Sequence, residues 1–465
     1  MELSLHDFLI RHPGTLRVIT LPKFSELSDP EQVMLHLVAD RLDSAKQVGS
    51  KMVEESEWVQ FCRLVGLYGF ASLIAQRLRK LKQTEALADW PYLDQMTARI
   101  ERTAVSETFH SASYDDSFNE VLRKLGPMSE KIVWIKGSSL RLMEYEAPEQ
   151  RFCTDFDIVV REEFVQSTVD TMVQQGYQFI AGFPAFCNQL GLGPVSKLSD
   201  FLCVPSPHLM SRALGTMCHE RHPAIDLKLA PFDRGLTLVE GERFWSDCLF
   251  KEHRGCRLRV PSKIDHLMIC AVNYVKDGWL SWKSLHDVHL LANTLTEPEW
   301  IELIRRCAVE GISTDMWACL SYSAEIFSTA VPQQVLPQLA PRTRIWLRRR
   351  LHFTASCEFS WNSNSLPGLF LNAISADDLA RKMTVISQSL CPTDLFIAAY
   401  YCRGSKYLQH SLLLARLVHF WLLMLPAFLV RKTFGRSLWD TQQQYAELGQ
   451  AGLAQTLDRS MQSIH

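Results

Sequence analysis

Several common signatures are missing from this 465-residue chain. Its thirteen cysteines are scattered, and no two of them form a C-x-x-C pair. We therefore expect reduced, mostly buried thiols, which are typical of a cytoplasmic protein. The sequence also has no G-x-x-x-x-G-K-[ST] phosphate loop and no G-x-S-x-G nucleophile elbow. P-loop nucleotide chemistry and α/β-hydrolase chemistry are therefore not expected.

A strong net charge and a long apolar run are missing as well. The formal net charge is −2 at pH 7, so no overall basic field attracts a long nucleic acid or an anionic membrane. The N-terminal residues 1–14 do not show the basic and then apolar segments of a secretory signal. The apolar segment 417–430 is interrupted by Pro426 and is shorter than the ~20 residues that span a bilayer. It is expected to be a buried helix, with an interfacial membrane anchor as the alternative.

The residues that are present favour a folded α+β protein. Hydrophobic residues make up 47% and charged residues 22% of the chain, which is long enough for two or three domains. Apolar residues recur at helical spacing from about residue 29, where Asp29 and Pro30 are typical of a helix start. We predict a helical N-terminal module at 1–125, a catalytic α/β domain at 126–258 and a helical C-terminal domain at 259–465.

Strands and helices alternate in the middle part of the chain. The stretches "KIVWI", "FDIVV", "YQFIAGF" and "PAIDLKLAP" are predicted strands, and "EEFVQSTVDTMVQQGY" is a predicted helix. The connection 184–221 between the last two strands is expected to be irregular. This pattern predicts a small sheet with helices packed on it.

Gly137 and Ser138 stand between a predicted strand and a predicted helix. Glycine allows a tight turn and a close approach of the backbone to a ligand. The first backbone N–H groups of a helix have no partner within the helix and attract phosphate. The turn is therefore a candidate phosphate site, although many strand-to-helix turns carry Gly-Ser for structural reasons alone.

Asp155 and Asp157 form a D-x-D pair on the next predicted strand. Alternate residues of a strand point to the same face, so the two carboxylates are expected to converge. Carboxylates that are close together repel unless a cation lies between them, and Mg²⁺ prefers such oxygen ligands. The alternative is that Asp155 caps a turn and only Asp157 faces solvent. Asp226, in the later strand "AIDLKL", is a third carboxylate among apolar residues, which is costly unless it is paired.

In this order the features "IKGSSL", "RFCTDFDIVV" and "AIDLKL" resemble the nucleotidyltransferase superfamily with a DNA polymerase β-like core, and within it nucleotidyltransferase family 5. The resemblance covers about residues 131–292. It implies a small polymerase β-like sheet flanked by helical domains. The chain departs from that group at Lys228, where the group usually has histidine.

The resemblance also implies a chemistry and roles for single residues. An NTP would be bound with two Mg²⁺ or Mn²⁺ ions, and its nucleoside monophosphate would move to an acceptor hydroxyl. The three carboxylates would be the catalytic residues and the metal ligands, namely Asp155, Asp157 and Asp226. The nucleotide would be contacted at four positions, namely Lys136, Gly137, Ser138 and Arg151.

Three further groups are weaker candidates. His219 and His222, beside Cys218, have the spacing of a zinc site, but a loop that contacts substrate is the better functional interpretation and a structural loop is favoured over both. Asp287 matches an acidic position of the resembling group and is a candidate wall of the active site. The basic stretch 342–353 is expected to be a solvated helix face rather than a contact for RNA or lipid.

The acceptor stays open at this stage. A small molecule is favoured, and a protein side chain or a tRNA end is the alternative. The competing hypothesis is a catalytically inactive binding or scaffold protein, which would be peripheral to a membrane if the segment 417–430 anchors it. The intact carboxylates argue against that hypothesis, because a site without a metal gains nothing from clustered acids.

Overall fold

The computed structural model describes residues 24–83, 90–180, 213–219, 221–232, 239–276, 281–340 and residue 377. The N-terminal residues 1–14, the basic stretch 342–353 and the apolar segment 417–430 lie outside this part of the chain. Of the helices in the described ranges, none has the length and apolar character needed to cross a membrane.

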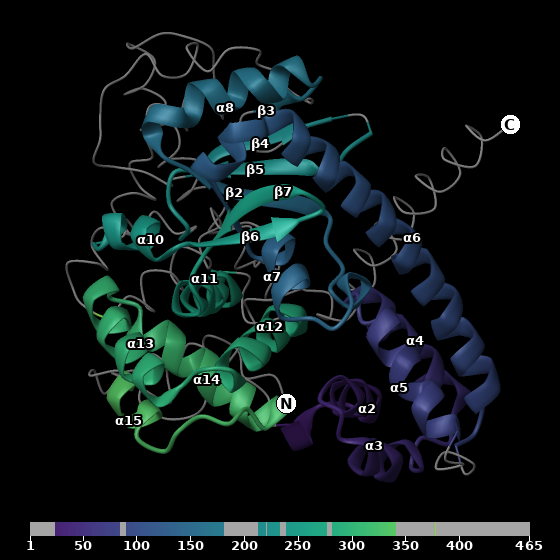
Figure 1. The fold of residues 1–465 in the computed structure, drawn as a ribbon. Helices are drawn as coiled ribbons and strands as arrows, with labels where there is room; N and C mark the ends of the chain where they lie inside the picture. Colours follow the sequence, from purple (N-terminus) through teal and green to yellow (C-terminus); the bar gives the residue numbers. More distant parts are fainter. Residues whose placement is uncertain are drawn as a thin grey trace, which may run out of the picture.

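A mixed sheet forms the centre of the described chain (Figure 1). Its strands run in the order β3-β4-β5-β2-β1-β7-β6. Their bounds are β1 Ile132–Ile135, β2 Asp155–Val160, β3 Gln178–Ile180, β4 Ala213–Cys218, β5 Ala224–Lys228, β6 Leu249–His253 and β7 Cys256–Val260. β2 pairs antiparallel with β1 and parallel with β5, and β1 pairs parallel with β7. The predicted α+β class is confirmed, and each of the four predicted strands is present.

Three strands were not predicted, for identifiable reasons. β4 lies inside the connection 184–221 that was expected to be irregular, so that prediction was wrong for Ala213–Cys218. β4 contains Gly215, which has a weak preference for strands, and its register with β5 shifts there. β6 is an exposed edge strand without an alternating pattern. Its hairpin to β7 turns at Arg254 and Gly255, which both have positive φ angles, and Arg-Gly is not a usual signal for such a turn.

Two layers of helices cover the two faces of the sheet (Figure 1). On one face, α6 (Leu93–Leu125) and α8 (Glu162–Gln174) pack on Trp134 of β1 and on Phe156 and Ile158 of β2. The intervening residues of β1 and β2 point to the other face, where they join a core with α7 (Gly137–Met143) and α11 (Lys263–Lys276). Because strand side chains alternate, the apolar residues beside the D-x-D pair belong to the α6–α8 face.

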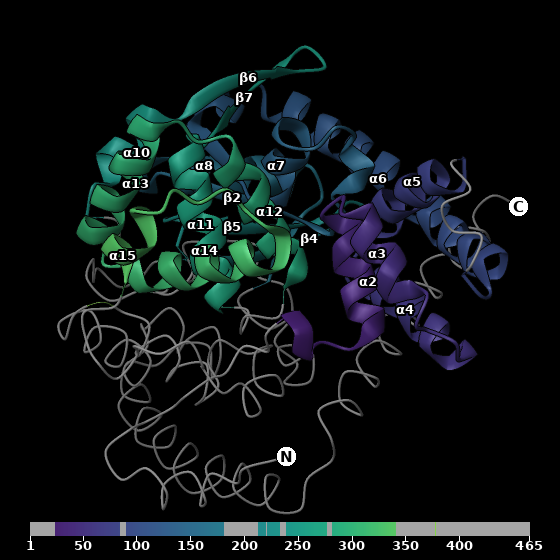
Figure 2. The same ribbon diagram turned by 90° about the horizontal axis from the view of Figure 1, so that it is seen from below.

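The other helices lie on the side of the sheet that α11 covers (Figures 1 and 2). Their bounds are α2 Asp29–Val38, α3 Leu42–Gly49, α4 Glu55–Leu67, α5 Ala71–Gln83, α10 Gly241–Asp247, α12 Trp282–Asn293, α13 Glu297–Glu310, α14 Ser313–Phe327 and α15 Val335–Leu339. Short 3₁₀ turns are η1 Phe24–Glu26, η2 Gly126–Lys131 and η3 Pro148–Gln150. One cluster of buried side chains extends from α2–α5 to α11–α14. The division into three domains stays a prediction.

The first described α-helix begins at Asp29, one residue earlier than it would if Asp29 were its cap. Ser28, rather than Asp29, is the N-cap of α2. The Glu31 carboxylate accepts hydrogen bonds from the Ser28 backbone N–H at 3.0 Å and from its hydroxyl at 2.7 Å, and so forms the reciprocal half of a capping box. Pro30 occupies the first turn, as expected.

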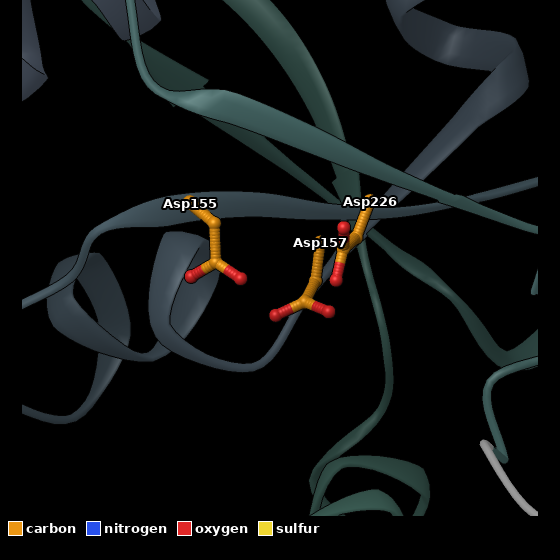
Figure 3. Close-up of side chains that lie close together, drawn as sticks. All are labelled: Asp155, Asp157 and Asp226. Carbon is orange, nitrogen blue, oxygen red and sulfur yellow. The ribbon is translucent and has the colours of Figure 1, made fainter. Parts of the chain in front are cut away.

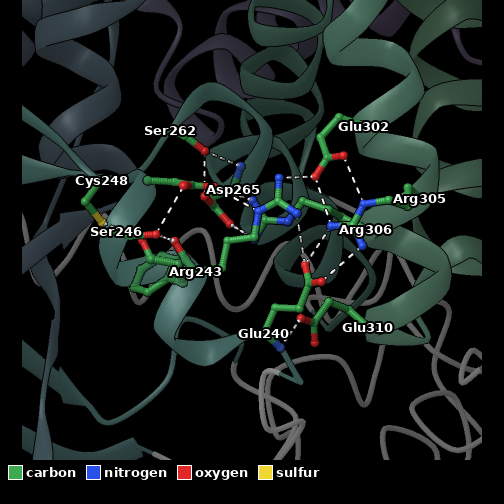
Figure 4. Close-up of polar contacts among 12 residues, drawn as sticks. Glu240, Arg243, Ser246, Cys248, Ser262, Asp265, Glu302, Arg305, Arg306 and Glu310 are labelled. Carbon is green, nitrogen blue, oxygen red and sulfur yellow. Dashed lines mark hydrogen bonds and ion pairs between the residues drawn. The ribbon is translucent and has the colours of Figure 1, made fainter.

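A polar network holds α10 and α13 together (Figure 4). Arg305 of α13 lies 2.7 Å from the Glu240 carboxylate, which precedes α10, and 2.9 Å from Glu302. The neighbouring Arg306 is only 1% exposed and pairs with the buried Asp265 of α11. The network anchors the helices that follow the sheet to the chain that leads into β6 and β7.

Glu107 of α6 gives the protein a predicted dependence of stability on pH. Its buried carboxylate accepts hydrogen bonds from the backbone N–H groups of Ala71 and Ser72, at 3.3 and 2.8 Å, where α5 begins. Burial raises its pKa to about 7, and these hydrogen bonds oppose the shift only in part. The folded state thus binds this proton more tightly than the unfolded chain. The stabilising contribution of this group to folding is fully present below pH 4.5, the pKa of the group in the unfolded chain. It is lost as the pH rises toward 7.

We expect the free energy of unfolding to fall by about 3 kcal/mol from this group across that window. In Glu107→Gln the decrease should disappear. Urea unfolding between pH 4.5 and 7 measures it, and Glu101→Gln, at a half-exposed position of the same helix, is the control. An unchanged pH slope in Glu107→Gln would contradict the prediction.

Candidate active site

Asp155, Asp157 and Asp226 come together on one face of the sheet (Figure 3). Each offers a carboxylate oxygen, and these oxygens all lie within 4.8 Å of one another. The parallel register of β2 and β5 places Asp157 directly opposite Asp226, and Asp155 is two residues earlier on the same face of β2. The predicted convergence is therefore present, and Asp157 is buried rather than facing solvent.

The cluster is electrostatically strained. Burial and the charges of Asp157 and Asp226 raise the pKa of Asp155 to about 6, and the ammonium groups of Lys136 and Lys228 oppose this shift. A group of three carboxylate ligands suits a hard divalent cation such as Mg²⁺ or Mn²⁺. A bound cation would also remove the repulsion that disfavours the ionised form of Asp155. The donor set thus fits the metal that the sequence led us to expect.

Two lysines contact the central carboxylate. The Nζ atom of Lys136 lies 3.1 Å from Asp157 Oδ1, and the Nζ atom of Lys228 lies 2.6 Å from the same oxygen. Lys136 was a predicted site residue, but Lys228 was noted only as a departure from the resembling group. The position of Lys228 could have been predicted from the sequence, because Lys228 follows Asp226 by two residues on a strand and must share its face.

Lys136 has a backbone conformation that is rare for a residue with a side chain. Its φ angle is 54° and its ψ angle is −134°, a combination that favours glycine. Such strain costs on the order of 1–3 kcal/mol and persists where the surroundings hold it in place. Here it turns the chain from β1 into α7 while the ammonium group reaches Asp157.

The serine side chains at the Gly-Ser turn are buried and already have partners within the protein. Ser138 as a whole is only 1% exposed, and its hydroxyl lies 3.0 Å from the Tyr114 hydroxyl, which also donates to the Asp155 carbonyl. Ser139 is buried too and contacts His266 Nε2 at 3.0 Å. A phosphate contact at this turn would therefore come from backbone N–H groups at the start of α7 and not from the serine hydroxyls. Nothing in the sequence indicates that Tyr114 contacts this turn, because Tyr114 lies on α6, in a different part of the chain.

Gly137 lacks space for any side chain. A Cβ atom at this position would lie 2.5 Å from the Cys153 sulfur, which is buried and cannot move aside freely. We expect Gly137→Ala to destabilise the protein by roughly 1–3 kcal/mol through overpacking. Chemical unfolding measures the loss. The double variant Gly137→Ala/Cys153→Gly removes the clash and should recover part of the lost stability. If no stability is recovered, the loss comes from the backbone and not from the contact with Cys153.

Arg151 is positioned by a partner from the helices that follow the sheet. Its Nε and Nη2 atoms donate to the two carboxylate oxygens of Asp287 on α12, at 2.8 and 2.7 Å, and its Nη1 atom donates to the Phe152 carbonyl. Both side chains are buried, and the Tyr145 hydroxyl also donates to Asp287 at 2.7 Å. Arg151 is near the turn, since its Nη1 atom is 3.7 Å from where a Cβ on Gly137 would stand. Asp287 is thus joined to the site through Arg151 and is not a member of the carboxylate cluster.

The histidine pair before β5 is arranged as a structural loop. The Nδ1 atom of His219 accepts the backbone N–H groups of Arg221 and His222, at 2.9 and 3.2 Å. His222 contacts Ser117 Oγ through its own Nδ1 atom at 2.9 Å. Within the described ranges, the three aspartates are the one group of His, Cys, Asp or Glu side chains with the spacing of a metal site. The zinc hypothesis for this pair therefore gains no support from these residues.

An α+β fold with three aspartates on adjacent strands, beside a strand-to-helix turn, is the arrangement that the nucleotidyltransferase resemblance implies. A family model described as "uncharacterised nucleotidyltransferase" matches residues 54–328. Because the match covers more than half of the 465 residues, the chain belongs to this nucleotidyltransferase family. A search of curated proteins finds none that matches it.

Proposed function

We propose that the protein is a metal-dependent nucleotidyltransferase. It moves a nucleoside monophosphate from an NTP to an acceptor hydroxyl and releases pyrophosphate. The observation that carries this proposal is the convergence of Asp155, Asp157 and Asp226 within 4.8 Å in a chain that belongs to a nucleotidyltransferase family. The reaction forms a bond between the acceptor oxygen and the α-phosphorus and breaks the bond from that phosphorus to the β-phosphate oxygen.

The three carboxylates would hold two Mg²⁺ or Mn²⁺ ions together with the triphosphate. When bound, the ions supply positive charge at the α-phosphate and lower the pKa of a coordinated hydroxyl group. Asp155 and Asp157 of β2 would provide metal ligands from one strand. Asp226 of β5 would complete the ligand set and take part in removing the proton of the acceptor hydroxyl.

The nucleotide contacts are proposed around the turn before α7. Backbone N–H groups of Gly137 and Ser138 would bind the β- and γ-phosphates. Lys136 would move its ammonium group from Asp157 toward the departing pyrophosphate. Arg151 would act as a fixed positive charge beside the turn, because Asp287 holds its guanidinium in place.

The acceptor is proposed to be a small molecule. A protein side chain or a tRNA end would require a docking surface of its own, and the near-zero net charge gives a long nucleic acid no general attraction. An amine is a less favoured acceptor group than a hydroxyl.

Transfer of label from α-³²P NTPs tests the proposal. The full chain is incubated with each NTP and Mg²⁺ in a small-molecule extract of its host, and the labelled product is identified by mass spectrometry. The double variant Asp155→Ala/Asp157→Ala is run in parallel. We expect labelled product with the natural protein alone. Equal labelling by both proteins would disprove a metal mechanism at these carboxylates, and no labelling by either would favour the inactive binding protein.

A further inference from the structure

Asp157 is paired with two ammonium groups that differ in their surroundings. Both contact the same oxygen, Oδ1, with Lys228 at 2.6 Å and Lys136 at 3.1 Å. The side chain of Lys228 is 4% exposed and that of Lys136 is 14% exposed. Lys228 is therefore the inner of the two cations, and it is fixed to β5 beside Asp226.

This arrangement changes the charge that a divalent cation meets. Three ionised carboxylates carry three negative charges, and the two ammonium groups offset two of them. Charges at such separations interact strongly in a poorly solvated site. A metal ion must therefore bind a cluster that is largely neutralised already, and it must share Asp157 with an ammonium group that cannot diffuse away.

The buried position of Lys228 would also stabilise the folded cluster when no metal is bound. Burying a carboxylate without a partner costs free energy. Removing one partner of a buried ion pair therefore typically destabilises a protein strongly. Lys228 provides Asp157 with a charged partner from the neighbouring strand. The same contact that stabilises the metal-free sheet opposes the entry of a metal ion.

We propose that Lys228 is a built-in counter-ion that competes with divalent cations for Asp157. The cluster is consequently preformed and binds the free metal ion weakly. It takes up the ion well when a triphosphate enters with it, because the phosphate charges offset the two lysines. The metal ion would then bind together with the nucleotide and would not stay bound to the protein in its absence. This inference rests on the proposed function, since it concerns the metal of that reaction.

Lys228→Met gives a result that a purely structural role would not give. Methionine keeps much of the length of the side chain and removes its charge. We expect the variant to bind Mn²⁺ in the absence of nucleotide about tenfold more tightly than the natural protein. We also expect its melting temperature without metal to fall, because Asp157 loses a partner. If Lys228 only supported the fold, its loss would weaken metal binding or leave it unchanged.

Isothermal titration of the full chain with MnCl₂ tests the proposal, with and without a non-hydrolysable ATP analogue. Lys251→Met removes a charge from the exposed edge strand β6 and is the control for net charge. It should bind Mn²⁺ like the natural protein, whose affinity should rise when the analogue is present. If Lys228→Met does not fold by circular dichroism, Lys136→Met replaces it and should tighten Mn²⁺ binding by a smaller factor.

The titration distinguishes a failure of the counter-ion role from a failure of the proposed function. Equal Mn²⁺ affinities of the natural protein and the lysine variant would overturn the counter-ion role and leave the proposed function intact. A natural protein that binds no Mn²⁺ even with the analogue would overturn the proposed function and this inference with it.

Discussion

Asp226→Asn is expected to lower kcat/KM for nucleotidyl transfer by at least about 10³-fold, which corresponds to a loss of about 4 kcal/mol of transition-state stabilisation. Asparagine keeps the shape of the side chain but removes the charge that completes the proposed metal site opposite Asp157. The fold should be preserved, because the substitution also removes repulsion within the cluster. Label transfer from α-³²P NTPs measures the effect.

A second measurement separates loss of the site from loss of the fold. Mn²⁺ with a non-hydrolysable NTP analogue should raise the melting temperature of the natural protein, since a ligand that binds only the folded state stabilises it. In Asp226→Asn this increase should be reduced or absent, while the melting temperature without ligand stays close to the natural value. Asp116→Asn, on an exposed part of α6, is the matched control and should behave like the natural protein. Transfer by Asp226→Asn within tenfold of the natural rate would exclude a catalytic role for this carboxylate.

Asp287→Ala is expected to destabilise the protein by about 3–5 kcal/mol. It leaves the buried guanidinium of Arg151 without the two carboxylate oxygens that hold it at 2.8 and 2.7 Å, and it removes the acceptor of the Tyr145 hydroxyl. An unpaired buried charge costs much more than the pair contributes. Urea unfolding monitored by circular dichroism gives the change in free energy.

Two further variants show whether the cost comes from the orphaned charge. The double variant Arg151→Met/Asp287→Leu replaces the pair with apolar side chains and should lose less stability than Asp287→Ala alone. Glu242→Gln breaks an ion pair with Arg161 in which the glutamate is mostly exposed, and it should cost under about 1 kcal/mol. A loss of less than 1 kcal/mol in Asp287→Ala would show that water reaches this pair.

The carboxylate cluster could be predicted from the sequence because strand geometry is simple. Alternation placed Asp155 and Asp157 on one face, and the apolar neighbour Phe156 accordingly packs under α6 and α8. The position of Asp226 followed from its similar strand context and from the family resemblance. No periodicity gives the partner of a strand, so the register that sets Asp157 opposite Asp226 came only from the structure.

The contacts around the cluster were harder to predict because they join distant parts of the chain. Asp287 lies on α12 and meets Arg151 only after the helices that follow the sheet have packed. Tyr114 lies on α6 and contacts both Ser138 and the backbone carbonyl of Asp155, the first residue of β2. Such contacts depend on tertiary packing, and single-sequence patterns contain no signal for them. The tight contact of Gly137 with Cys153 was equally hidden, so the glycine was interpreted as space for a ligand.

The placement of the cluster on two strands has a consequence for biosynthesis. Asp155 and Asp157 leave the ribosome long before Asp226, and β5 must then pair alongside β2 in parallel. Pairing between distant segments is among the slower events of folding, because the intervening chain must close first. A nascent or truncated chain that ends before residue 224 contains two of the three acids but no site. The appearance of the proposed metal-dependent nucleotide binding during synthesis would therefore report the moment at which β5 joins the sheet.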